Sequence, residues 1–126
     1  MDKKNPNLTA LLFNECINNQ DLDGLCSLMT EGHTFIVKDE KSRIGKEKMR
    51  KDWGDFFRLF PDYKNHFPRI ESRDDLVIIV GFSICSNESL LNGPALWTAK
   101  IENDRIAEWR VYNDTGDNRK SLKITA

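Results

Sequence analysis

Residues 105–114 read Arg-Ile-Ala-Glu-Trp-Arg-Val-Tyr-Asn-Asp, and they follow the short polar segment Glu102-Asn103-Asp104. An apolar-rich segment, a tight polar turn and an aromatic segment together predict a β-hairpin. The second strand ends on a carboxylate, Asp114, close in sequence to Trp109 and Tyr112. A carboxylate at a strand end could project into an apolar pocket and act there as an acid or a base. The alternative is that Asp114 is an ordinary turn residue that opens a polar tail.

Three segments upstream of this hairpin have the apolar spacing of helices. The first begins at Asn5-Pro6, which is typical of an N-cap followed by proline in the first helical position. A shorter second helix is expected after Asp21, whose side chain can cap it. The third follows Gly45 and ends before Pro61, and its wide apolar stripe consists of Met49, Trp53, Phe56, Phe57 and Phe60.

The remaining regular segments are predicted to be strands. They cover residues 33–38 and then roughly 63–72, 75–86, 94–102 and 105–113, with a polar connection at 39–45. Helices that precede most of the strands predict an α+β fold with an antiparallel sheet. At 126 residues the chain is expected to be a single domain with its core at about 7–114. The polar residues 115–126 are expected to be loosely ordered.

Composition excludes several kinds of partner. The formal net charge of -1 gives no reason to expect nucleic acid or an acidic membrane surface. No apolar run is long enough to cross a bilayer, and none near Met1 resembles a signal peptide, so we expect a cytoplasmic protein. Cys16, Cys26 and Cys85 are odd in number and widely spaced, which favours free thiols. We expect no metal site and no cofactor.

The segment at 76–86 is apolar on both of its predicted faces. One face can pack against the helices, and the other needs a cover. A second copy of the chain would supply it, which predicts a homodimer formed through the sheet face. The alternative is that residues 1–6 or 115–126 fold over this face.

Four short motifs occur in an order that resembles one known superfamily. They are Asn19-Gln20-Asp21-Leu22-Asp23-Gly24-Leu25, Gly45-Lys46-Glu47-Lys48-Met49, Phe60-Pro61-Asp62-Tyr63 and the final strand from Arg105 to Asp114. Together they resemble the nuclear-transport-factor-2-like superfamily, and its SnoaL-like polyketide cyclase branch in particular. The resemblance implies a cone, in which a strongly curved antiparallel sheet wraps around three N-terminal helices and encloses a pocket for a small hydrophobic molecule.

The resemblance also suggests which known chemistries are absent. Where ketosteroid isomerase has its general-base aspartate and oxyanion-hole tyrosine, this chain has Val37 and Phe13. Those side chains cannot remove a proton or stabilise a dienolate. Of the working residues of limonene epoxide hydrolase, only the acidic strand-end residue is matched, by Asp114. Neither reaction is therefore expected here.

Two classes of function stay open. The first is a cofactor-independent SnoaL-like enzyme that performs acid/base chemistry on a hydrophobic carbonyl compound. Asp114 would be its acid/base, with a pKa raised by desolvation, and His33 would be its partner; the alternative for His33 is a turn histidine. The second class is a non-catalytic ligand-binding or protein-interaction module. In both, the expected pocket residues are Phe35, Trp53, Phe57, Ser83, Trp97, Trp109 and Tyr112.

Overall fold

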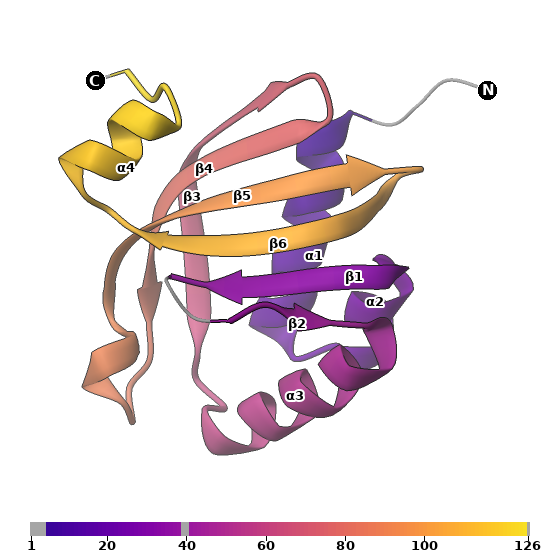
Figure 1. The fold of residues 1–126 in the computed structure, drawn as a ribbon. Helices are drawn as coiled ribbons and strands as arrows, with labels where there is room; N and C mark the ends of the chain where they lie inside the picture. Colours follow the sequence, from indigo (N-terminus) through magenta and orange to yellow (C-terminus); the bar gives the residue numbers. More distant parts are fainter. Residues whose placement is uncertain (1–4, 39–40, 126) are drawn as a thin grey trace.

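The computed structural model describes residues 5–38 and 41–125. Its helices are α1 (Pro6–Asn19), α2 (Leu22–Ser27), α3 (Lys46–Leu59) and α4 (Gly116–Ser121), with one 3-10 turn, η1 (Ser89–Leu91). Its strands are β1 (Met29–Val37), β2 (Arg43–Ile44), β3 (Lys64–Arg73), β4 (Leu76–Ile84), β5 (Gly93–Glu102) and β6 (Arg105–Asn113). They form one sheet in the order β2-β1-β6-β5-β4-β3 (Figure 1). Neighbouring strands are antiparallel except β1 and β6, which are parallel. The predicted α+β class and the curved sheet are confirmed, and four of the five pairings among the described strands are antiparallel as expected, whereas the pairing of β1 with β6 is parallel.

The first two helices begin where their capping residues predict. The Asn5 side chain accepts a hydrogen bond from the Asn7 N–H at 2.9 Å, and Asp21 accepts one from the Gly24 N–H at 2.9 Å. Each cap satisfies an N–H that would otherwise lack a partner in the first helical turn. The predicted polar connection at 39–45 contains the short strand β2, and its residues 39–40 lie outside the described part of the chain.

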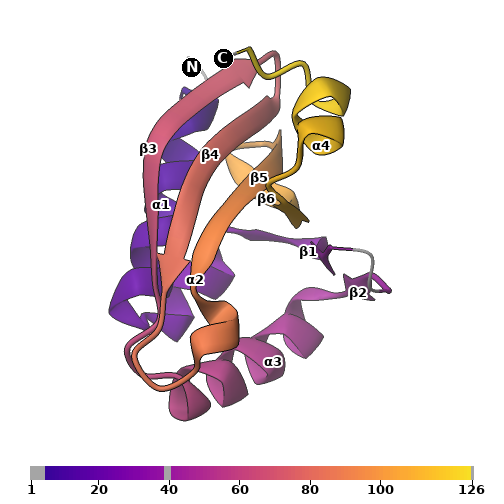
Figure 2. The same cartoon turned by 90° about the vertical axis from the view of Figure 1, so that its left-hand side faces the viewer.

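A bulge bends the sheet between β3 and β4. Their pairing shifts between His66 and Arg69, opposite Gly81. A Cβ atom on Gly81 would lie 2.1 Å from the carbonyl oxygen of His66, so only glycine allows the two strands to approach this closely. Figure 2 shows β3 and β4 bending along their length beside α1, with α3 below the end of the sheet. The bend opens the space between the sheet and α3.

The core lies between α1 and the concave face of the sheet. Phe13 and Ile17 of α1 are completely buried, and Trp97 and Trp109 of the sheet are each only 1% exposed. The rings of Phe13 and Trp109 have their centroids 4.6 Å apart. Full burial of a large apolar side chain contributes about 1.5–3 kcal/mol. These contacts therefore hold α1 in place, and α1 closes one side of the cone.

The expectation of a loosely ordered tail is wrong for residues 116–125. They form α4 and a following turn, which two arginines of β3 bind at the outer face of the sheet. Arg73 donates a hydrogen bond to the Leu122 carbonyl at 2.6 Å, and Arg69 donates one to the Thr125 carbonyl at 2.5 Å. These partners are 49 and 56 residues apart in the chain, so local sequence does not reveal the contact.

The outer face of β4 is covered at one end only. Ile78 is 2% exposed, whereas Phe82 and Ile84 are 39% and 47% exposed. The tail alternative thus accounts for the end near Arg73, where residues 116–125 are bound. The homodimer stays a prediction, and Phe82 and Ile84 are the side chains that a second copy would cover.

Candidate functional site

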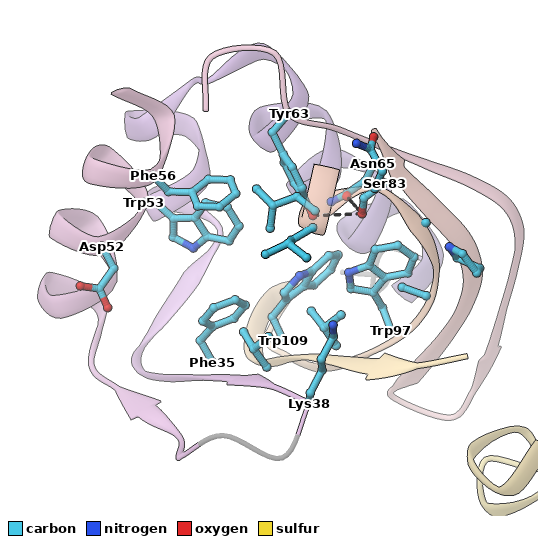
Figure 3. A pocket seen from close by; sticks show the side chains of 18 of the residues that line it. Phe35, Lys38, Asp52, Trp53, Phe56, Tyr63, Asn65, Ser83, Trp97 and Trp109 are labelled. Atoms are coloured by element: carbon cyan, nitrogen blue, oxygen red, sulfur yellow. Dashed lines mark hydrogen bonds between the residues drawn. The ribbon is translucent and has the colours of Figure 1, made fainter. Parts of the chain in front are cut away.

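A pocket of about 310 Å³ opens between α3, the end of β1 and the concave ends of β4, β5 and β6 (Figure 3). Most of its wall is apolar, and the η1 turn with the start of β5 closes one side through Leu90, Leu91 and Pro94. Its volume is in the range of ordinary small-molecule sites in proteins. Its aromatic lining consists of Phe35, Trp53, Phe56, Tyr63, Trp97 and Trp109.

Ring contacts hold one side of the pocket rigid. The centroid of Trp53 lies 5.6 Å from that of Phe35 and 5.6 Å from that of Phe56. Phe56 in turn meets Tyr63 edge-on, with centroids 4.9 Å apart and planes at 86°. Aromatic pairs at such separations prefer these tilted geometries. The pocket therefore presents a preformed apolar wall on which a flat ring can pack.

One wall of the pocket carries a chain of hydrogen bonds. The Tyr63 hydroxyl oxygen lies 3.1 Å from the Ser83 hydroxyl oxygen, and Ser83 donates to Asn65 Oδ1 at 2.7 Å. The Asn65 backbone is held by Asn18, whose side chain accepts from the Asn65 N–H at 2.8 Å and donates to the Asn65 carbonyl at 2.9 Å. This chain of hydrogen bonds is thus anchored to α1 through Asn18. Its side chains therefore keep their positions when the pocket is empty.

Tyr63 is the ionisable member of this chain of hydrogen bonds. Burial raises the pKa of its phenol, and hydrogen bonds from Ser83 and Asn65 offset part of that rise. The phenol is therefore neutral at physiological pH and can both donate and accept a hydrogen bond. Sequence reasoning proposed Ser83 but missed Tyr63 and Asn65, because Tyr63 was interpreted only as part of a helix exit.

Two charged side chains also line the pocket, Lys38 and Asp52. The Asp52 carboxylate accepts two hydrogen bonds from Arg43, at 2.9 and 3.1 Å. Strand alternation from Phe35 places Lys38 on the opposite face, but the chain leaves β1 there with a φ of 56°. The Lys38 N–H donates to the Val111 carbonyl at 2.7 Å, and the side chain extends into the pocket (Figure 3).

Five of the seven expected ligand-binding residues line the pocket: Phe35, Trp53, Ser83, Trp97 and Trp109. The other two do not. Phe57 is buried beside Trp53, with ring centroids 5.6 Å apart. Tyr112 lies on the outer face, with its hydroxyl 3.2 Å from that of Thr98 and its ring 4.8 Å from the Arg110 guanidinium carbon. Side chains alternate between the two faces along β6, and Tyr112 is three positions after Trp109. Tyr112 therefore lies on the outer face, whereas Trp109 faces the pocket.

Asp114 lies outside the pocket lining and is paired with α4. Its carboxylate accepts two hydrogen bonds from Arg119, at 2.6 and 2.9 Å. The side chains are 14% and 36% exposed, respectively. The hydrogen bonds from Arg119 lower the pKa of Asp114, against the opposing effect of burial. The structure therefore gives this carboxylate a low pKa, whereas the acid/base role was expected to require a raised one.

His33 also lies outside the pocket lining, in the core. Its Nδ1 lies 2.7 Å from the Ile106 carbonyl oxygen, whereas its buried Nε2 has no partner among residues 5–38 and 41–125. Burial lowers the pKa of the imidazole, against the opposing effect of the bond to Ile106. Ile106 is the second residue of β6 and Asp114 follows the end of that strand, roughly 25 Å away along an extended strand. The structure does not bring His33 and Asp114 together.

The described part of the chain holds no group of three or more His, Cys, Asp or Glu side chains placed to bind a metal ion. In the same residues, no helix is both long and apolar enough to cross a membrane.

Comparisons with known proteins agree with this architecture. A family model described as the SnoaL-like domain matches residues 10–114. A cystatin-fold protein from Novosphingobium aromaticivorans superposes with a TM-score of 0.77 at 18% identity, over 87% of this chain and 99% of that chain. A proposed SnoaL-like polyketide cyclase from Shewanella putrefaciens superposes with a TM-score of 0.77 at 13% identity, over 98% and 89% of the two chains.

A third structure of the same fold was obtained by co-crystallisation with a small molecule. TerC, co-crystallised with polyporic acid, superposes with a TM-score of 0.73 at 10% identity, over 94% of this chain and 99% of that chain. At such identities the similarity concerns the fold, and function has to be argued from the site. The comparison with curated proteins gives no match.

Proposed function

Because this chain belongs to the SnoaL-like domain family, we propose that its pocket binds a small, flat, hydrophobic carbonyl compound. The observation that carries the proposal is the hydrogen-bonded chain Tyr63–Ser83–Asn65, set into an otherwise aromatic wall. A mostly apolar pocket with a few convergent polar groups is the usual form of a small-molecule site. TerC, which shares the fold, was crystallised with a small molecule, and this adds support.

The direction of the hydrogen bonds suggests how a ligand would be oriented. Ser83 gives its only proton to Asn65, so the Tyr63 proton goes either to Ser83 or to a ligand oxygen. A carbonyl group can accept that proton, and a ligand hydroxyl can donate to the free lone pairs of Tyr63. The rings of Phe35 and Trp109 would contact the flat body of the ligand.

Acid/base catalysis on the same ligand is the second candidate function. A neutral phenol beside a carbonyl can stabilise negative charge that develops on its oxygen. Asp114 and His33 stay the candidates from the sequence for the proton-transfer groups, and in this structure both would have to act from outside the pocket. Binding without turnover is therefore the better-supported proposal.

Ligand screening tests the binding proposal. Aromatic ketones, polyketide-like aromatics, steroids and terpenes would be screened by thermal shift and by quenching of tryptophan fluorescence. A ligand at about 100 times its dissociation constant adds about 2.7 kcal/mol, which is a shift of several degrees. Ala95→Phe, which places a ring in the pocket, should abolish the response, while Asp114→Asn, outside the lining, should keep it. If folded Ala95→Phe protein still responds to every hit, the pocket is not the binding site.

Proton exchange separates binding from catalysis. A bound ketone would be incubated in deuterated water, and loss of the signal of the carbon-bound proton next to the carbonyl would be followed by NMR. Exchange faster than in buffer, and slowed by Tyr63→Phe, supports the catalytic candidate. An unchanged exchange rate at saturating protein supports binding alone.

A further inference from the structure

We propose that the pocket selects ring compounds that carry an acidic group, and that the ammonium group of Lys38 binds that group. This inference rests on the proposed function and specifies the class of its ligand. A carboxylate or an ionised enol on a flat ring system fits the description. The structural basis is the placement of Lys38, which has no ion-pair partner among residues 5–38 and 41–125, in an aromatic pocket whose lining carboxylate, Asp52, is paired with Arg43.

Lys38 enters the pocket because of its backbone conformation. Its φ of 56° interrupts the alternation of β1, and its N–H is fixed by the Val111 carbonyl at 2.7 Å. Tyr63 and Lys38 project into the pocket from opposite sides (Figure 3). A ligand that contacts both would present a hydroxyl or carbonyl group to Tyr63 and its acidic group to Lys38.

The charge balance of the pocket favours an anion. Lys38 and Asp52 are the charged residues of the lining, and Arg43 binds the Asp52 carboxylate through two hydrogen bonds. Within the described residues, the Lys38 ammonium group has neither a hydrogen bond nor an ion pair. Tyr63, on the opposite wall, is neutral because burial raises its pKa. Among the described residues of the lining, an anionic ligand therefore meets the free positive charge of Lys38 and no free negative charge.

The strength of the preference follows from exposure. Lys38 is an exposed residue at the mouth of the pocket, so solvent and salt screen its charge. A charge-assisted hydrogen bond is nevertheless stronger than a neutral one, and a preference of about tenfold is a reasonable size for this position. The preference should decrease when the salt concentration rises.

A pair of probes with the same rings tests the inference. The affinities of 2-naphthoate and 2-naphthamide, which differ in charge and hardly in shape, would be measured by quenching of tryptophan fluorescence at low and high potassium chloride. We expect the wild type to bind the acid about tenfold more tightly at low salt. Lys38→Met should remove that preference and keep the affinity for the amide. Lys41→Met makes the same change of charge three residues away, outside the pocket lining, and should keep the preference.

The outcomes distinguish this inference from the proposed function. Equal affinities for the two probes in the wild type would overturn the inference and leave the apolar pocket standing as a binding site. A preference that survives in Lys38→Met would also overturn it, because another group would then bind the acid. If neither probe binds while the ligands of the wider screen also fail, the proposed function and the inference fail together.

Discussion

Arg119 of α4 donates two hydrogen bonds to Asp114, at 2.6 and 2.9 Å, just after the last strand of the sheet ends. The pair ties the end of β6 to the C-terminal helix. Because Asp114 is paired here and does not line the pocket, its substitution is expected to affect stability and leave ligand binding unchanged.

Asp114→Asn should cost up to about 1 kcal/mol in the free energy of unfolding, since Arg119 is partly exposed and the pair is screened. The paired Asp114 has a pKa below its usual value of 3.8. Its contribution is therefore present above about pH 4 and is lost as pH falls through the lower, folded-state pKa. Urea unfolding at neutral and acidic pH measures this, with Arg119→Gln as the companion variant. A loss of ligand binding in folded Asp114→Asn protein would contradict the assignment of Asp114 to a structural role outside the pocket.

If the pocket binds its ligand as proposed, Tyr63→Phe should weaken ligand binding about five- to tenfold, because it removes the hydroxyl beside Ser83 that would also bond the ligand. Fluorescence titration with a hit from the screen would measure the change. Tyr112→Phe is the matched control, since it removes a hydroxyl bonded to Thr98 on the outer face. Equal effects of the two substitutions on affinity would argue against a role of Tyr63 in binding.

His33 should make the protein less stable in mild acid. Burial lowers its folded-state pKa below the usual 6.5, so the unfolded chain binds more protons between these two values. Its stabilising effect is complete above about pH 6.5 and is lost as pH falls toward the folded-state pKa, with a slope of at most about 1.4 kcal/mol per pH unit. Urea unfolding from pH 7.5 downward should show this slope in the wild type and in His66→Gln, which alters an exposed histidine.

His33→Gln should flatten that slope, because glutamine does not titrate and can still donate to the Ile106 carbonyl. A slope as steep in folded His33→Gln protein as in the wild type would assign the acid sensitivity to another group.

Gly81→Ala should destabilise the fold by about 3 kcal/mol, because its new methyl group would meet the His66 carbonyl oxygen at 2.1 Å. Gly32→Ala is the control, since a Cβ atom there has nothing within 4 Å. We expect it to stay within about 1 kcal/mol of the wild type. Thermal unfolding of both variants would test the requirement for glycine at the bulge, and a stable Gly81→Ala protein would refute it.

The homodimer predicted from the outer sheet face would involve Phe82 and Ile84, which are exposed beyond the reach of the C-terminal segment bound at Arg73. If a second copy covers them, sedimentation equilibrium should give twice the chain mass, and Phe82→Lys should give the monomer. Thr34→Lys, on a different strand, is a control for added charge. A monomeric wild type at high concentration would exclude this interface.

Local patterns were sufficient for the first three helices and the four late strands, but they did not predict α4. Asn5 and Asp21 cap the helices that they predict, and the stripe through Trp53 predicts α3. The predicted ranges of the four late strands differ from β3–β6 by no more than two residues at either end. Such patterns succeed because caps and apolar periodicity depend on neighbours in sequence.

The candidate site was only partly predictable. Ser83 and the aromatic residues of the pocket wall followed from strand and helix faces, whereas Lys38 was assigned to the opposite face. Its left-handed φ is set by the bond to Val111, which is 73 positions later in the chain. Asp114 looked like a pocket residue because its partner Arg119 lies in a tail that sequence composition describes only as polar.

The amino-acid sequence by itself determined the first three helices, the late strands and the apolar faces that form the core, since each depends on side chains a few residues apart. Only the tertiary structure decided which polar groups meet. Asn18 of α1 fixes Asn65 of β3, Tyr63 reaches Ser83 of β4, and Arg73 binds the C-terminal segment. The physical reason is that a hydrogen bond requires its atoms within about 3 Å, and for groups far apart in the sequence the curvature and register of the whole sheet decide that distance.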